Sequence, residues 1–156
     1  MLSDERMACE KGKNMKILVS ACLLGKNCKY SGGNNYSEAV AKFIESHAAE
    51  VTAVCPEVLG GLPTPRVPSE IVCDKVMTKD GRSVDNEFHA GAQMALEIAL
   101  REGAELAILQ SRSPSCGLKE VYDGSFTGKK VKGMGVFARL LTENGIKAID
   151  VEDLAL

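Results

Sequence analysis

Short apolar runs alternate with longer amphipathic segments along the chain. Four of these runs are too short for helices and lack the polar alternation of a half-exposed strand. They occupy residues 16–21, 51–54, 106–109 and 146–149. Continuous apolar runs are typical of strands in parallel sheets, because helices cover both faces of such sheets.

Three longer segments have apolar residues at helical spacing. One helix is predicted to start at Ser37, whose hydroxyl can cap it, and to run toward residue 47. The clearest helix is predicted over residues 85–102, with Asp85 as its cap and Gly103 as its end. A third is predicted over residues 135–144.

The connections after the strands contain residues that restrict or interrupt the backbone. The loop over residues 22–36 is long and polar, and the loop after Cys55 contains several prolines and glycines. We expect the second loop to be fixed in shape without a regular element. Asp80-Gly81 lies between apolar residues, which predicts a small β-hairpin with its turn at residues 79–82.

Strands that alternate with helices predict parallel pairing with right-handed crossovers. The expected fold is therefore α/β: a single three-layer domain with a mostly parallel, Rossmann-like sheet and a small β-hairpin. A chain of 156 residues fits one domain. We expect that domain to span residues 15–156, after a flexible N-terminal extension of residues 1–14, with Met15 as an alternative start.

The composition excludes several classes of partner. Hydrophobic residues make up 45% and charged residues 26% of the chain, as in ordinary globular proteins. Lys and Arg total 19 against 21 Asp and Glu, so the net charge is −2, whereas binding to duplex nucleic acid needs a basic face. Aromatic residues are only 4%, and Trp is absent, so a stacking platform for single strands is also poorly supplied.

The chain has six cysteines, and the chemistry expected of them depends on the cellular compartment. Residues 1–14 are polar, and the apolar run before Cys22 is only Ile17-Leu18-Val19, too short for an export or lipoprotein signal of roughly 7–15 residues. We therefore expect a cytoplasmic protein without a membrane segment. Thiols in that compartment are more often metal ligands or catalytic groups than disulfides.

Three cysteines follow the ends of predicted strands. Cys22, Cys55 and Cys116 each come directly or shortly after an apolar run, and the carboxyl ends of parallel strands share one edge of a sheet. Three thiolates at such an edge suit a soft metal or an iron–sulfur cluster. The spacing lacks the close cysteine pair of a zinc finger. Buried small hydrophobic residues remain the alternative, because free cysteine is often fully buried.

The sequence around these cysteines resembles a known family. Residues 19–25 read Val-Ser-Ala-Cys-Leu-Leu-Gly, and residues 113–117 read Ser-Pro-Ser-Cys-Gly. Between them, Cys-Pro-Glu at residues 55–57 precedes Gly-Gly-Leu-Pro-Thr-Pro-Arg at residues 60–66. In this order the three motifs resemble the signature of the TudS-like thiouracil desulfurases. The resemblance runs over residues 16–149 and includes Tyr30, Gly32, Gly91-Ala92, Tyr122-Asp123-Gly124, Gly133 and Gly135.

The resemblance implies a cytoplasmic enzyme with a [4Fe-4S] cluster bound by Cys22, Cys55 and Cys116. It implies that the fourth iron binds the sulfur of a small thiolated pyrimidine such as thiouracil. Water then replaces sulfur without a redox change, and sulfide is released. The family's further functional residues correspond to Glu57 and Ser113, as candidates for proton transfer and for holding substrate or water.

Alternatives remain open for several residues and for the function. Glu57 is alternatively a carboxylate that caps loop amides, and Ser113 a residue that sets the turn before Pro114. Cys28 is a fourth ligand, a sulfur carrier or a loop thiol. Arg66 and Glu70 are substrate contacts or members of a surface ion pair. Two other functions compete: a cluster or sulfur carrier without turnover, and a structural zinc domain.

Overall fold

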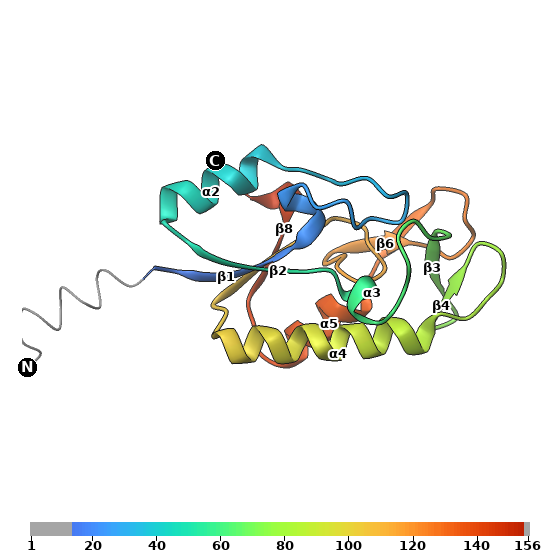
Figure 1. The fold of residues 1–156 in the computed structure, drawn as a ribbon. Coiled ribbons are helices and arrows are strands. Elements are labelled where there is room, and N and C mark those ends of the chain that lie inside the picture. Colours follow the sequence, from blue (N-terminus) through green and yellow to red (C-terminus); the bar gives the residue numbers. More distant parts are fainter. Residues whose placement is uncertain (1–13, 155–156) are drawn as a thin grey trace, which may run out of the picture.

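A four-stranded parallel sheet forms the centre of the computed structural model, which describes residues 14–154 (Figure 1). The strand order is β2-β1-β5-β8. The strands are β1 (Lys16–Ser20), β2 (Glu50–Val54), β5 (Leu106–Leu109) and β8 (Ala148–Asp150). All of the pairings are parallel, which confirms the predicted sheet.

The expected N-terminal extension lies almost wholly outside the described residues. Only Asn14 of that segment is described, and Cys9 is not.

Helices cover both faces of the sheet and form the outer two layers (Figure 1). They are α2 (Glu38–His47) on one face, and α4 (Asp85–Glu102) with α5 (Val136–Glu143) on the other. The chain moves from β1 to β2 in one direction, and then from β2 through β5 to β8 in the opposite direction. Right-handed crossovers in opposite directions place their helices on opposite faces. The predicted three-layer α/β architecture is therefore confirmed.

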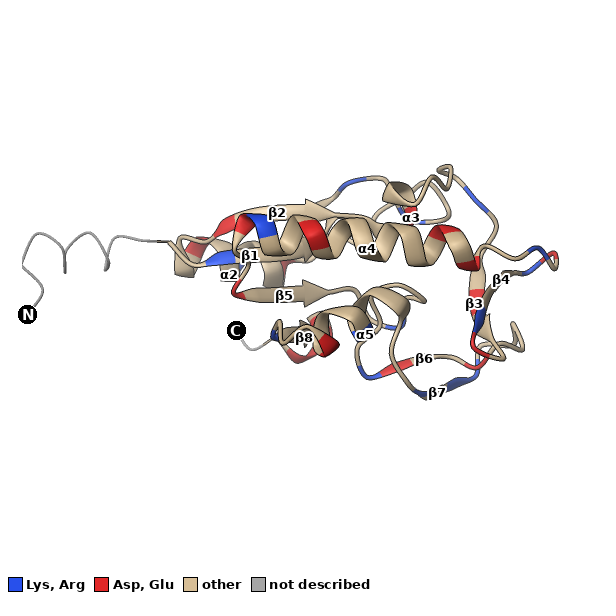
Figure 2. Cartoon of the chain, turned by 90° about the horizontal axis from the view of Figure 1, so that it is seen from below, with Lys and Arg blue, Asp and Glu red and all other residues tan. Residues whose placement is uncertain are grey.

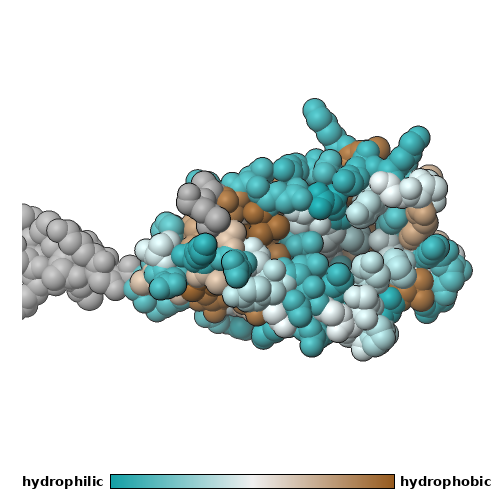
Figure 3. Space-filling model, turned by 90° about the horizontal axis from the view of Figure 1, so that it is seen from above, coloured by the Kyte–Doolittle hydropathy of each residue, from teal (hydrophilic) through white to brown (hydrophobic). Residues whose placement is uncertain are grey.

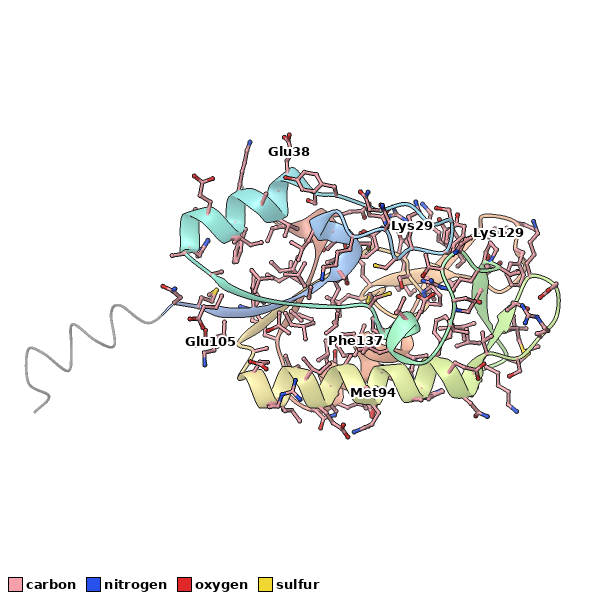
Figure 4. The ribbon with its side chains drawn as sticks, viewed as in Figure 1. Lys29, Glu38, Met94, Glu105, Lys129 and Phe137 are labelled. Carbon is pink, nitrogen blue, oxygen red and sulfur yellow. The ribbon has the colours of Figure 1, made fainter. Side chains whose placement is uncertain are left out.

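The hydrophobic core has a part on each side of the sheet. Leu18 faces α4 and α5 together with Phe137, whereas its neighbours Ile17 and Val19 face α2 together with Val40. This alternation along β1 follows the two-residue period of a strand. Phe137 lies between the sheet and α4 (Figure 4). Because both faces of β1 are buried, the carboxyl end of this strand is held rigidly.

The small hairpin is present, with a tight turn that was not predicted in addition to the predicted one. Strands β3 (Ser69–Val72) and β4 (Lys75–Thr78) are joined through Cys73 and Asp74. Both turn residues have positive φ, as a two-residue hairpin loop of the I′ type requires. The predicted turn at residues 79–82 also forms: the Gly81 N–H donates to the Thr78 carbonyl oxygen at 3.0 Å, and Met77 and Ser83 form an antiparallel bridge.

Several further elements differ from the prediction. Helix α3 (Pro56–Leu59) lies where no regular element was expected, and Pro56 suits its first position because a helix has no partner for that N–H. A second hairpin, β6 (Glu120–Tyr122) with β7 (Lys130–Lys132), was not predicted. Two 3₁₀ helices, η1 (Ala21–Leu24) and η2 (Val151–Asp153), follow β1 and β8.

The cap of α4 was also predicted wrongly. Val84 is the N-cap residue, and Asp85 is the first residue of the helix. The Asp85 carboxylate instead accepts a hydrogen bond from the Val76 N–H at 3.0 Å. Asp85 therefore ties the hairpin to the long helix.

Two glycines bring the backbones of α3 and α4 into direct contact. A Cβ atom on Gly91 would lie 1.8 Å from the Pro56 carbonyl oxygen, and one on Gly60 would lie 1.9 Å from the Glu87 carbonyl oxygen. Side chains at these positions have no room. The close approach fixes α3, and with it Cys55 and Glu57, against the long helix.

We expect Gly91→Ala to destabilise the fold by about 1–3 kcal/mol or more, because the added methyl group meets a backbone that cannot move away. In an ordinary helix interior the same change would stabilise the protein by about 0.8–1.0 kcal/mol. The sign of the change in unfolding free energy therefore shows whether the contact between α3 and α4 exists. Urea unfolding measures the difference. Gly33→Ala is the control, because its Cβ would meet the Ser31 hydroxyl oxygen at an ordinary 3.5 Å. An unchanged or raised unfolding free energy for Gly91→Ala would contradict the contact.

Candidate active site

A cavity of about 490 Å³ opens at the carboxyl edge of the sheet, within the size range of small-molecule sites. It lies where the strand order reverses between β1 and β5, the position at which α/β sheets commonly bind ligands. Sulfur atoms gather above α3, near the end of β2 (Figure 4). The cysteines that line the cavity are Cys22, Cys28, Cys55 and Cys116.

The three predicted ligand cysteines come from three different strand ends. Cys22 lies in η1 directly after β1, Cys55 is the N-cap residue of α3 after β2, and Cys116 lies in the loop after β5. The structure therefore brings together the three thiols whose convergence the sequence predicted. Cys73 is exposed in the hairpin turn.

A polar side chain contacts each of the two most buried thiols. Burial raises the pKa of the Cys22 thiol, while a hydrogen bond from Asn35 Nδ2 at 3.4 Å opposes this rise. Burial likewise raises the pKa of the Cys116 thiol, and a hydrogen bond with Ser20 opposes it. Such thiols are neutral on their own, and a thiolate-binding metal would displace their protons.

The donor set fits a cluster better than a single ion. Among residues 14–154, no three Cys, His, Asp or Glu side chains are arranged to bind one metal ion. In a cubane cluster each thiolate binds a different iron, so its ligands surround a larger volume. Three thiols spread around one cavity match that requirement. A cluster held by the thiolates of Cys22, Cys55 and Cys116 fits this donor set.

Glu57 lies in the first turn of α3, and both of its carboxylate oxygens are held by side chains. Oε1 accepts a hydrogen bond from Arg66 Nε at 3.0 Å, and Oε2 accepts one from the Ser115 hydroxyl at 3.1 Å. The side chain is 15% exposed and lines the cavity. The geometry thus fixes the orientation of the Glu57 carboxylate beside the cysteines.

Arg66 forms an ion pair with Glu57, as expected, but its side chain is largely buried, so the pair does not lie on the surface. Its side chain is only 7% exposed. Besides Glu57, the guanidinium donates to the carbonyl oxygens of Cys28 at 2.8 Å and Pro63 at 3.1 Å, and to the Thr64 hydroxyl at 3.0 Å. Arg66 therefore joins the Cys28 loop, α3 and the proline-containing loop.

Ser113 holds the turn that carries Cys116. Its hydroxyl oxygen accepts hydrogen bonds from the backbone N–H groups of Ser115 and Cys116, each at 3.0 Å. This contact supports the turn-setting interpretation. Ser113 also lines the cavity, and its own hydroxyl proton has no acceptor among the described residues' hydrogen bonds. The Ser113 proton is therefore available to a bound molecule.

Three polar residues of the site were not singled out by the sequence. Asn35, Ser20 and Ser115 hydrogen-bond to a predicted ligand or to Glu57. None of them belongs to a spacing pattern that signals this contact, although Ser20 and Ser115 lie inside the cysteine motifs.

Glu70, a candidate substrate contact, supports the cavity rim instead. Its Oε1 accepts hydrogen bonds from the N–H groups of Gly124 and Phe126, at 2.9 and 3.1 Å. These residues belong to the connection between β6 and β7. Glu70 therefore fixes that connection, which contributes Phe126 to the cavity wall.

We expect Arg66→Ala to lower the unfolding free energy by about 1–3 kcal/mol or more, because it removes the charged partner of the largely buried Glu57 carboxylate. Thermal or urea unfolding measures the loss. The matched control is Arg82→Ala, which removes an exposed ion pair with Asp80 and should cost less than about 1 kcal/mol. The double variant Arg66→Ala/Glu57→Gln should recover part of the loss. Equal costs for Arg66→Ala and Arg82→Ala would disprove the buried role.

No helix within residues 14–154 has the length and apolar character needed to span a membrane. The face seen in Figure 3 is mainly hydrophilic, with hydrophobic residues in separate small groups.

Comparison with known proteins agrees with this geometry. Residues 17–153 match the model of the 2-thiouracil desulfurase family. The protein YbbK of Bacillus subtilis (strain 168) is 38% identical, in an alignment that covers 88% of this chain and 97% of YbbK. The solved structure of the [4Fe-4S]-dependent thiouracil desulfidase TudS is 39% identical and has a TM-score of 0.83. That match covers 90% of this chain and 93% of TudS. The family match and both similarities extend over nearly the whole fold, and the chain therefore belongs to the 2-thiouracil desulfurase family.

Proposed function

We propose that this protein is a [4Fe-4S]-dependent desulfurase that converts a small thiolated pyrimidine, such as thiouracil, into its oxo form and releases sulfide. The observation that carries the proposal is the convergence of Cys22, Cys55 and Cys116 on one cavity beside Glu57. The similarity to the [4Fe-4S]-dependent desulfidase TudS supports it. We assign the activity to one domain of residues 15–156.

Cys22, Cys55 and Cys116 would hold the cluster through their thiolates. With three protein ligands, a cubane cluster has one iron that can act as a Lewis acid toward the sulfur of a thiocarbonyl group. A carrier without turnover does not need a group for proton transfer, whereas the Glu57 carboxylate is held in the same cavity.

Glu57 is the group that we assign to proton transfer. Its carboxylate takes a proton from the water that attacks the thiocarbonyl carbon, and returns it to the leaving sulfur. Arg66 and Ser115 hold the two carboxylate oxygens, so that the base is oriented before substrate binds. Ser113 uses its free hydroxyl proton to hold the substrate or the water.

The reaction balances without electrons. Water and the thiocarbonyl compound give the oxo compound and hydrogen sulfide, because the C–S bonds are replaced by C–O bonds at an unchanged oxidation state of carbon. The protein therefore needs no redox partner for turnover.

A small substrate in the cytoplasm fits the charge distribution. Acidic and basic residues are interspersed in Figure 2, and the net charge of the chain is −2. A folded transfer RNA would need a continuous basic surface. We therefore place the substrate among free thiolated pyrimidines and exclude duplex nucleic acid as a partner.

The test is anaerobic incubation of the cluster-loaded protein with 2-thiouracil, 4-thiouracil or a thiolated transfer RNA, without an electron donor. We expect sulfide and the oxo base to appear in equal amounts from a free base. Uracil serves as the control that yields no sulfide. Strict dependence on dithionite, or activity on transfer RNA alone, would contradict the proposal. Bound cluster without sulfide from any thio compound would favour the carrier function.

A further inference from the structure

A fourth thiol lies in the cavity, and the proposed reaction does not use it. Cys28 is half-buried in the loop after η1 and lines the same cavity as Cys22, Cys55 and Cys116. The family resemblance requires three cysteine ligands and gives Cys28 no role. The Cys28 thiol is able to bind metal, and it lies in the cavity where we propose that the cluster is held.

Contacts hold Cys28 beside the ligand cysteines. Its thiol lies next to the Cys55 thiol in the cavity. Its carbonyl oxygen accepts hydrogen bonds from Arg66 Nη2 at 2.8 Å and from the Cys55 thiol at 3.7 Å. The backbone of Cys28 is therefore anchored, and its side chain lines the same cavity as the three proposed ligands.

We propose that Cys28 is an exchangeable fourth ligand, whose thiolate binds the remaining iron when no substrate is present and is displaced by the substrate's sulfur. This inference rests on the proposed function. Thiolate and thiocarbonyl sulfur are both soft donors, so they compete for the same iron. In the exchange, the bond from iron to Cys28 Sγ breaks, a bond from iron to the substrate's sulfur forms, and Cys28 takes up a proton from solvent. No electron is transferred.

A displaceable ligand changes the kinetics in a defined direction. Ser is a poor ligand for this iron because its hydroxyl is a harder donor. In Cys28→Ser the substrate has no thiolate to displace, so KM should fall several-fold while kcat stays within about twofold. Replacing a thiol that only fills space would not lower KM while leaving kcat nearly unchanged.

Alkylation under anaerobic conditions tests the exchange directly. Iodoacetamide transfers its acetamide group to a free thiol with loss of iodide, and peptide mass spectrometry locates the product. In the cluster-loaded protein we expect Cys28 to be protected, and to become labelled when inorganic sulfide or 2-thiouracil is added, but not when uracil is added. Cys73, exposed in its hairpin turn, is the internal control and should be labelled in every sample.

Each other outcome has a definite meaning. Labelling of Cys28 in the loaded protein before sulfide is added would show a free thiol and overturn the inference. Protection that persists with sulfide, and ends only after a reductant, would show a disulfide and also overturn it. An iron assay on the same samples separates the two proposals. If no iron is bound, the proposed function itself fails. If iron is bound but Cys28 is labelled without added sulfide or 2-thiouracil, the proposed function stands and only the role of Cys28 is rejected.

Discussion

Serine in place of Cys22, Cys55 or Cys116 should abolish cluster binding, whereas serine in place of Cys73 should leave it unchanged. Each of the three cysteines supplies a thiolate from a different strand end, and a hydroxyl is a poor replacement for thiolate toward iron. Iron and sulfide analysis of anaerobically reconstituted protein, together with visible absorption, measures the effect. We expect iron to fall to background in each of the three variants.

The controls distinguish lost ligands from lost folding. Circular dichroism of the cluster-free variants should match that of the cluster-free parent, because Ser is close to Cys in volume. Cys73→Ser tests whether any cysteine substitution lowers iron content, and Cys9→Ser, at a position outside the described residues, should also keep iron. Full iron content in Cys22→Ser would contradict the assignment of Cys22 as a cluster ligand.

Glu57→Gln should retain the cluster and lose about 10²–10⁴-fold in turnover, the range for removal of a general acid–base group. Glutamine keeps the shape of the side chain and an oxygen that accepts from Arg66 Nε, but it cannot take up the proton of an attacking water. Initial rates of sulfide release at saturating 2-thiouracil, normalised to iron content, measure the loss.

The matched control is Glu70→Gln. Glu70 is also a carboxylate at the cavity, but its oxygen only accepts from backbone N–H groups, a role that the amide oxygen of glutamine preserves. Its turnover should stay within about twofold of the parent. Loss of iron together with activity in Glu57→Gln would make Glu57 structural, and unchanged turnover would remove it from the mechanism.

The sheet and the position of the cavity were predictable because they depend on local apolar patterning. The run that contains Ile17 to Val19 is apolar on both faces, which only a parallel strand between two helix layers explains. The turn at Cys73-Asp74 was missed because neither residue is glycine, and because Asp80-Gly81 nearby is the stronger local signal. The Asp80-Gly81 turn forms as well, so the sequence signal located one of the two turns.

Helix α3 and the burial of Arg66 were not predictable for a related reason. Four residues after Cys55 carry too little periodicity to indicate a helix, and α3 is fixed by its contact with Gly91 of α4. The partners of Arg66 come from three segments, whose proximity is a product of the fold. Sequence motifs predicted roles for Glu57 and the three cysteines, but the groups that contact them follow from packing.

The pairing of β1 with β5 also determines when the metal centre can be made. Cys22 and Cys116 become neighbours only after this pairing, and the longest helix separates them in the chain. Contacts between distant segments form slowly compared with local ones. A nascent chain therefore has no complete ligand set until β5 and the loop behind it have left the ribosome. On this assignment, iron and sulfide enter a chain that has already folded, through the opening of the cavity at the carboxyl edge of the sheet.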